Sequence, residues 1–471
     1  MRSRNYMTID NNNFNGGKHC EGQSSQEGHG KDTLLTSCSN GDSKYRKEMV
    51  VNHIPVDEEA ISLHLPPVDG KRAWIVVIGL FLVTIFNGVM QEYYLRAKLF
   101  PEENLVMWLT FVGVLFEVFF RFFIFLGNII YPLIGFKLVL ILGITMMVGG
   151  LILSSLATSI WQLYLTYSLC CGTGAAVLTL TGYRILPQWF TKRLSTASGV
   201  FSASLGFGGI VLPPFTNRVN EILGPIWTYR ILALIIFVCG LIGFSCIKER
   251  KATSLSKGND NQKKRRQSIN DMFGFDLLKN TNLVLWITMG PIYLCVVCIK
   301  ATFIPSSVTA IGLSDVDGAL AVTVSSIAGI TGSIIIGILA DKFGNLNIFI
   351  ICTVIAALSV FLLWMMMHSL VGLMAFCVIH GLSCPAFFTV STSVLISIVG
   401  REDYPKAVGL RALVTIFSII GPFIATYLET LDTGMEPYFY CKFVSGAGYT
   451  ICALLGLVIK LRMNPKLLAK I

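Results

Sequence analysis

After its first 72 residues, the chain consists mainly of apolar runs of about 20 residues, separated by short polar segments. A helix of that length rises about 30 Å, which matches the hydrocarbon core of a bilayer. Of all residues, 54% are hydrophobic and only 14% are charged. A soluble protein could not cover its surface with so few polar groups. The sequence therefore predicts an all-α integral membrane protein.

The apolar runs predict twelve transmembrane helices in two groups of six. Their ranges are 73–95, 105–127, 136–157, 162–186, 195–216 and 226–247, then 282–304, 319–340, 346–367, 370–398, 406–428 and 439–461. Residues 248–281 are charged and rich in turn-forming residues, which is typical of a linker. We expect a disordered cytosolic tail at 1–72, six-helix bundles at 73–247 and 282–461, and a short tail at 462–471.

The cations indicate the orientation of the chain. Lysine and arginine outnumber the acidic residues by 37 to 27, but they lie in tails and loops, which argues against nucleic-acid binding. The cationic segments include Lys71, Arg72, Lys137, Lys192, Arg193, Lys342, Arg401 and Lys460. By the positive-inside rule, these segments and both termini are cytosolic. We expect the plasma membrane, with an internal membrane such as that of a vacuole as the alternative.

A weak internal repeat supports the division into two groups. Ala197 and Gly199 in STASGV correspond to Ala407 and Gly409 in KAVGLR, 210 residues further along the chain. The glycines of GNIIYPLIG and GILADKFG correspond at nearly the same offset. Two related bundles with a binding site between them at mid-membrane are typical of a transporter.

The segment GSIIIGILADKFG combines Gly337 and Gly344 with Asp341 and Lys342 at the end of a predicted helix. Glycines allow helices to approach closely, and the charged pair would cap a tight turn between two spans. The segment resembles the loop signature of the major facilitator superfamily. That resemblance implies the superfamily's fold of two six-helix bundles. It also implies a cytosolic gate made by these residues and by the basic loop before the fifth helix, which contains Lys192 and Arg193.

Four further segments resemble the monocarboxylate porter family, and its fungal branch in particular. They are PPVDGKRAW, which contains Asp69, Gly70 and Trp74; QWFTKRLSTASGVFSASLGFGG; FIPSSVTAIGLSDVDGALAV; and NGVMQEYYL. The resemblance implies a symporter that moves a small organic acid together with protons.

The sequence departs from these families in two places. Tyr131 and Pro132 stand where the superfamily usually has an acid and a base, so we expect the charged gate contact in the C-terminal bundle only. Ser333 in the eighth helix stands where many relatives have an intramembrane arginine, which the family uses to pair with the substrate carboxylate. A carboxylate needs such a cation in a low-dielectric cavity. The sequence therefore leaves open whether the solute is a simple monocarboxylate such as lactate.

Several polar residues lie inside the predicted spans, where they are costly unless they face a bundle interior or a cavity. Asn87 and Gln91, one turn apart on the first helix, either line a cavity or bond to a neighbouring helix. Lys300 on the seventh helix is the leading substitute for the arginine missing at Ser333. His380 is either a hydrogen-bonded packing residue or a proton relay.

Glu117 and Arg121 on the second helix form the most informative pair, because residues four apart share a helix face. In one interpretation they are a self-contained ion pair. In the other, Glu117 takes up and releases a proton, and its protonation frees Arg121 for a substrate anion. Arg184 is expected to extend to the membrane interface, and Arg411 to lie at a cytosolic helix start.

The sequence shows no metal-ligand cluster, nucleophile triad or nucleotide-binding fold, so we expect neither an enzyme nor a bound cofactor. Ser268, in RRQSI of the linker, is a candidate phosphorylation site. The leading hypothesis is a secondary transporter of a small organic solute, with protons and the lipid bilayer as its other partners. The alternatives are a uniporter of a non-carboxylate solute such as a vitamin, and a nutrient sensor that does not transport.

Overall fold

The computed structural model describes residues 68–84, 105–250, 274–310, 312–367, 369–430 and 438–464. Every regular element in these ranges is a helix. Lipid offers no hydrogen-bond partners, so a segment that spans the membrane must pair its backbone N–H and C=O groups with one another, as a helix does. Asn87, Gln91, Ser268 and nearly all of the predicted N-terminal tail lie outside the described residues.

The helices before the linker are called the N-terminal half below. They are α2 (Lys71–Thr84), α4 (Leu105–Ile134), α5 (Phe136–Ser154), α6 (Ile160–Leu163), the π-helix η1 (Tyr164–Cys171), α7 (Gly172–Trp189), α8 (Leu194–Leu223) and α9 (Pro225–Cys246). Because α6, η1 and α7 follow one another without a break, they make up a single span.

The helices after the linker are called the C-terminal half. They are the 3-10 helix η2 (Phe275–Lys279), α12 (Thr281–Ala310), α13 (Asp315–Phe343), α14 (Asn345–Ser359), the π-helix η3 (Val360–Trp364), α15 (Leu370–Ser383), α16 (Ala386–Thr415), the 3-10 helix η4 (Ile416–Ile419), α17 (Ile420–Thr430) and α18 (Phe439–Met463).

Ten stretches of the described residues are long and apolar enough to cross a membrane. One of them, Leu370–Tyr427, has 58 residues and would be about 87 Å long as a straight helix, far more than a bilayer requires. Gly400 divides this stretch, because its φ of 80° lies in the left-handed region and interrupts α16. With this division and with α2, of which 14 residues are described, the structure agrees with the twelve predicted spans.

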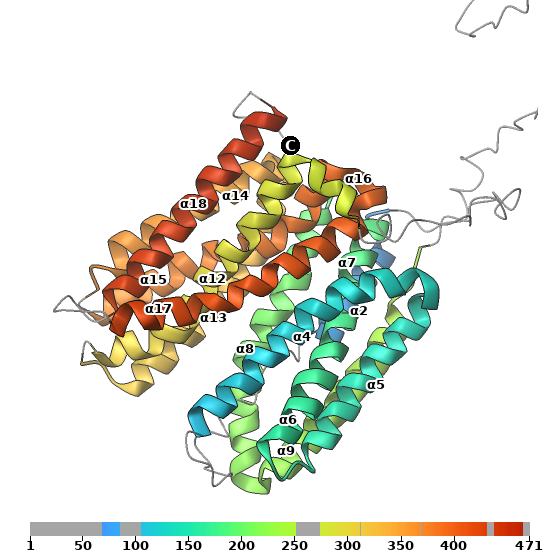
Figure 1. The fold of residues 1–471 in the computed structure, drawn as a ribbon, viewed down its shortest axis with the longest axis horizontal. Coiled ribbons are helices and arrows are strands. Elements are labelled where there is room, and N and C mark those ends of the chain that lie inside the picture. The colour runs from blue at the N-terminus through green and yellow to red at the C-terminus, as the bar shows by residue number, and fades with distance from the viewer. Residues whose placement is uncertain are drawn as a thin grey trace, which may run out of the picture. The chain divides into compact units, whose positions relative to one another are not determined.

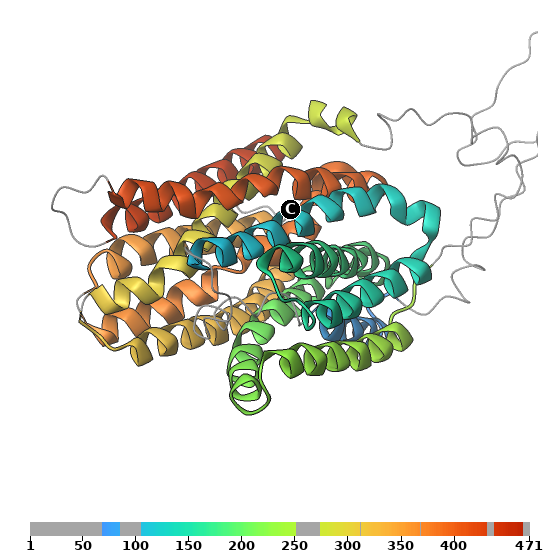
Figure 2. The ribbon, with the colours of Figure 1, turned by 60° about the horizontal axis from the view of Figure 1, so that its bottom comes forward.

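The helices of each half gather together, as the blue-to-green and yellow-to-red ribbons of Figure 1 show. The N-terminal half contains two clusters of buried apolar side chains. The large cluster of the C-terminal half also includes Ile124 and Phe125 of α4 and Ala176 and Leu180 of α7. The apolar core of the C-terminal half therefore continues across the boundary between the halves. In Figure 2, α4 (cyan) lies along the helices of the C-terminal half.

The halves meet mainly along two pairs of helices, α8 with α13 and α4 with α16. Glycines allow the close approach in both pairs. A β-carbon at Gly199 of α8 would collide with the backbone carbonyl oxygen of Ser333 in α13. A β-carbon at Gly409 of α16 would lie 3.0 Å from the side-chain nitrogen of Asn128 in α4. The two glycines that correspond in the sequence repeat therefore have the same role in the two contacts.

One end of the bundle carries most of the cations and is called the basic end. Here α2 and α8 begin, and α4 and α13 end. Hydrogen bonds between the helices bring these helix ends together. Arg401, Lys460 and Arg462 lie at the same end.

We predict opposite effects of alanine at two glycines of α8. Gly199→Ala should lower the thermal unfolding midpoint of the purified protein, because crowding of a packed contact costs about 1–3 kcal/mol. Gly209→Ala is the matched control, since no atom lies within 4 Å of a β-carbon there. The control should leave the midpoint unchanged or raise it, because alanine favours a helix by about 1 kcal/mol over glycine. Equal midpoints for the two variants would contradict the packing argument.

Candidate functional site

Asp69 lies immediately before α2 and holds the loop that precedes α8. Its carboxylate accepts hydrogen bonds from the backbone N–H groups of Thr191, Lys192 and Arg193, at 3.3, 3.2 and 3.2 Å. The Thr191 hydroxyl adds a fourth bond of 2.9 Å. Partial burial raises the pKa of the Asp69 carboxyl, but the hydrogen bonds from Lys192, Thr191 and Arg193 outweigh this effect and hold the pKa below its ordinary value. The carboxylate therefore stays ionised at neutral pH, and its contribution to stability is lost only as the pH falls through the acidic range.

The remaining signature residues complete the same contact. Gly70 precedes α2, and its carbonyl accepts the first bond of the helix from Ala73, at 3.0 Å. The Trp74 ring packs edge-on against Phe190, with 5.3 Å between ring centroids. The stretches PPVDGKRAW and QWFTKR, far apart in the sequence, therefore form one structural unit.

Asp341, in the last turn of α13, caps the first turn of α8 across the boundary between the halves. Its Oδ1 accepts from the backbone N–H of Ser195 at 2.9 Å, and its Oδ2 accepts from the N–H and hydroxyl of Thr196 at 2.8 and 2.6 Å. A carboxylate is favoured at this place, because the first N–H groups of a helix lack internal partners and carry a partial positive charge. Gly337 allows the contact, since a β-carbon there would lie 2.6 Å from the Ser195 carbonyl oxygen.

The other expected gate residues lie around this contact. Asp341 bonds to α8, and the exposed Lys342 lies over the ring of the adjacent Phe343. The turn itself is formed by Gly344, whose φ is 100°. Lys192 and Arg193 contribute backbone N–H groups to Asp69, while their side chains are exposed.

A contact between α4 and α16 corresponds to the Asp341 contact in the other half of the repeat. The side-chain amide of Asn128 donates a hydrogen bond to the carbonyl of Pro405. Arg184 donates to the Asn128 side-chain oxygen from Nε at 2.8 Å, and its guanidinium lies 4.4 Å from the centre of the Tyr131 ring. Arg401 also crosses the boundary, with a bond of 2.9 Å to the carbonyl of Pro187. Arg184 therefore orients this contact.

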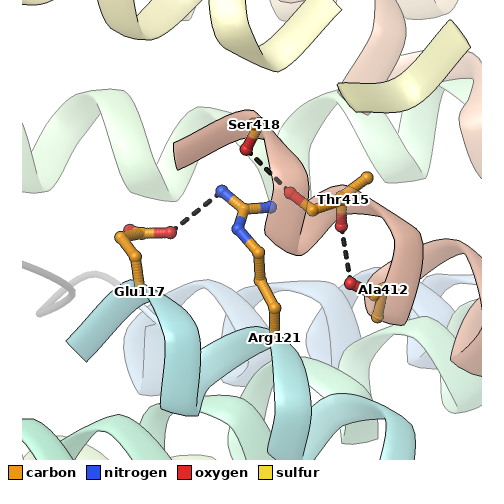
Figure 3. A network of polar contacts seen from close by, with 5 residues as sticks. All are labelled: Glu117, Arg121, Ala412, Thr415 and Ser418. Atoms are coloured by element: carbon orange, nitrogen blue, oxygen red, sulfur yellow. Dashed lines mark hydrogen bonds and ion pairs between the residues drawn. The ribbon is translucent and has the colours of Figure 1, made fainter. Parts of the chain in front are cut away.

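Glu117 and Arg121 form the ion pair that their spacing predicts, with 2.9 Å between Oε2 and an Nη atom. The Arg121 side chain is 14% exposed, and its Nε is buried without a hydrogen-bond partner among the described residues. The Glu117 side chain is 46% exposed and is therefore much less buried than its partner. In Figure 3, the Arg121 guanidinium lies between Glu117 and the turn of the C-terminal half that contains Thr415 and Ser418. The pair thus lies at the boundary between the halves.

Lys300 and His380 lie together inside the C-terminal half. Lys300 is half-buried and donates to the hydroxyl of Ser325 on α13 at 3.1 Å. His380 is fully buried between the rings of Phe376 and Tyr449, at centroid distances of 5.1 and 5.3 Å. Neither of its ring nitrogens has a hydrogen-bond partner among the described residues.

Arg411 was expected at a cytosolic helix start, and the structure places it elsewhere. Its span begins after Gly400, so Arg411 lies about 16 Å along the helix, and it is only 7% exposed. One Nη atom donates to the hydroxyl of Ser391 at 2.8 Å. The guanidinium lies 5.2 Å from the centre of the Tyr183 ring and 5.8 Å from that of Phe387. The sequence signal was the turn ISIVGREDYP, whose glycine marks the true start of the span.

The fold and these loop contacts agree with a comparison of the sequence with known families. The profile of the Major Facilitator Superfamily matches residues 73–306 and 285–470. The chain therefore belongs to this superfamily, as its GILADKFG segment predicts.

Among known proteins, fungal transporters are similar to this chain. The uncharacterized transporter ESBP6 of Saccharomyces cerevisiae is 25% identical over 87% of this chain and 62% of its own length, so the chain spans less than two thirds of that relative. The probable transporter MCH2 of the same yeast is 22% identical, over 83% of this chain and 82% of its own length. The agnestins efflux protein AgnL12 of Paecilomyces divaricatus is 25% identical, over 85% and 90%.

Solved structures of transporters have the same fold. The human organic anion transporter MFSD10 matches with a TM-score of 0.63 and 14% identity, over 83% of this chain and 100% of its own. The proton:xylose symporter XylE matches with a TM-score of 0.62 and 13% identity, over 84% and 95%.

We predict that Asp341→Ala opens the basic end of the bundle. The readout is maleimide labelling of Ser393→Cys, a buried position whose hydroxyl lies 2.7 Å from that of Ser195 beneath the contact. Labelling should be about tenfold faster, because each lost bond to a carboxylate is worth about 1.5–3 kcal/mol and about 1.4 kcal/mol is a factor of ten.

Asp69→Ala is the matched control for this experiment. Its carboxylate binds the same loop, but within one half, so labelling should not change. Equal labelling in the Asp341→Ala and wild-type proteins would contradict a cross-half role of Asp341.

Proposed function

We propose that this protein is a secondary transporter that moves a small organic solute by alternating access. The moving units are the six-helix bundles at 73–247 and 282–461, joined by the linker at 248–281. The basic end faces the cytosol, since cations are retained on that side of a membrane, and both termini are then cytosolic. The solute binds between the bundles, near mid-membrane.

The observation that carries this proposal is the pair of polar contacts between the halves at the basic end. The bonds of Asp341 to α8, and of Asn128 to α16, lie at helix ends, where water can replace them when they break. Deeper in the membrane, the halves touch through glycines such as Gly199, which need little side-chain rearrangement to slide or part. Such an arrangement allows the basic end to open when these bonds break and the apolar contacts of α4 and α7 with the C-terminal core part.

The solute is proposed to be a small organic acid or a related metabolite. The segments that resemble monocarboxylate porters support this class. One similar structure is titled an organic anion transporter, and one relative is named an efflux protein, so export is tested together with uptake. A uniporter of a non-carboxylate solute is the alternative, because Ser333 is only 1% exposed and packs against α8, where it supplies no cation.

Proton coupling is assigned to Glu117. Its carboxylate pairs with Arg121 at the boundary between the halves and is partly open to solvent. Protonation would neutralise Glu117 and release the guanidinium, so the charge at the boundary would depend on pH.

We predict that Glu117→Gln removes the pH dependence of transport and leaves solute exchange intact. The glutamine keeps the size and polarity of the side chain but cannot titrate. Glu221→Gln is the matched control, because Glu221 forms an exposed pair with Arg218 at 3.1 Å, one helix turn away on α8. The initial rate of solute movement is measured across a pH series. A pH profile in Glu117→Gln that matches the wild type would exclude this residue as the proton site.

We further predict a solute difference between cells with and without the protein. Metabolite-wide uptake and retention are compared at two external pH values, and at least one small organic solute should change in a pH-dependent manner. The absence of any difference under both conditions would refute the transport proposal and favour a sensor.

A further inference from the structure

The least expected charge in the molecule is the guanidinium of Arg411. It is buried where the two halves meet, and among the described residues no carboxylate forms an ion pair with it. Its one hydrogen bond goes to the neutral hydroxyl of Ser391, at 2.8 Å, and its Nε is buried without a partner in the described part of the chain. A guanidinium has five N–H donors, so most of its donor capacity is not used by the described residues.

The surroundings of Arg411 do not neutralise this charge. Tyr183 and Phe387 present ring faces at 5.2 and 5.8 Å, and such contacts stabilise a cation only in part. Trp286 donates its indole N–H towards the Ser391 hydroxyl at 3.4 Å and stacks on Phe387 at a centroid distance of 5.4 Å. Planar aromatic rings and one hydroxyl group therefore surround the Arg411 guanidinium, and together they are called the aromatic frame.

The two halves meet at this frame. Tyr183 belongs to α7 of the N-terminal half, whereas Arg411, Ser391 and Phe387 belong to α16. One turn beyond Arg411 is Thr415, which faces Arg121 of α4 in Figure 3. Two guanidinium groups thus approach one stretch of α16, and Glu117 is the one described carboxylate that pairs with either. The described part of the boundary therefore has an excess of positive charge.

We propose that Arg411 binds the anionic group of the solute, and that the solute is a small organic monoanion with a planar or aromatic ring. Arginine binds carboxylates through two parallel hydrogen bonds, and Ser391 supplies a further donor. The aromatic rings around Arg411 favour a planar ring in the solute. When the halves part, Tyr183 moves away from Arg411 and the guanidinium becomes accessible. This inference rests on the transport function proposed above and assigns its substrate class.

The test uses the purified full chain and three probes at neutral pH: benzoate, cyclohexanecarboxylate and benzamide. Benzoate should raise the thermal unfolding midpoint by several degrees, because a ligand that binds only the folded state stabilises it. Cyclohexanecarboxylate should act more weakly, and benzamide should have no effect. Arg411→Gln should abolish the benzoate shift. Arg230→Gln should preserve it, since Arg230 also lies over a ring, that of Trp227, but is exposed.

A benzoate shift of wild-type size in Arg411→Gln, or no shift in the wild type, would overturn the proposal. Equal shifts with benzoate and cyclohexanecarboxylate would overturn the planar-ring requirement.

A second measurement separates binding from a merely structural role. Without ligand, Arg411→Met should unfold at or above the wild-type temperature, because it removes a buried charge that lacks a counter-ion. A clear decrease would point to a structural cation and contradict the proposal. Ser391→Ala retains the arginine and should weaken benzoate binding roughly five- to tenfold, whether or not the Arg411 variants fold. Unchanged binding in Ser391→Ala would overturn the site.

The transport assay distinguishes the failure of this site from the failure of the function. If the wild type changes the level of a solute and Arg411→Gln changes it equally, Arg411 is not the binding cation, and the transport function stands. If the wild type changes no solute, the transport proposal itself fails.

Discussion

The hydrocarbon core of the bilayer supplies no hydrogen bonds, and the rest of the structure depends on this constraint. It requires continuous helices, and it makes every polar group at mid-membrane costly unless another part of the protein satisfies it. The polar contacts accordingly gather in two places. Asp69, Asp341 and Asn128 satisfy helix ends and loops at the basic end, where water is near. Glu117, Arg121 and Arg411 lie at the boundary between the halves, where Arg121 and Arg411 are largely buried.

The boundary between the halves combines a tight contact with few specific bonds. Gly199 and Gly409 bring the helices of opposite halves into backbone contact, so their association depends on close packing more than on large interlocking side chains. Asp341 makes the two ends of this boundary different, because it caps α8 at one end of the bundle only. Separation at the basic end would break these bonds and also part the apolar contacts that α4 and α7 make with the core of the C-terminal half.

Much of the fold was predictable because it follows from local properties. Span length, hydropathy and the positions of turns lie within short windows, and the pairing of Glu117 with Arg121 follows from the helix period alone. The candidate sites were less predictable. Asp341 bonds to residues 145 and 146 positions away, and Lys192 and Arg193 act through backbone N–H groups that any residue would supply. Neither the distant bonds of Asp341 nor the backbone contacts of Lys192 and Arg193 can be predicted from a sequence motif.

The sequence by itself determined an all-helical membrane protein, its spans and its superfamily, because each of these depends on local composition and on short motifs. The tertiary structure decided where the charges lie. Arg411 resembles an ordinary flanking cation until the left-handed Gly400 shifts the start of its span and places it in the buried interior of the helix packing. Its surroundings come from Tyr183 of one half and Phe387 of the other, so its burial is a property of their packing. Burial and charge compensation depend on residues far apart in the chain, and only the folded molecule brings them together.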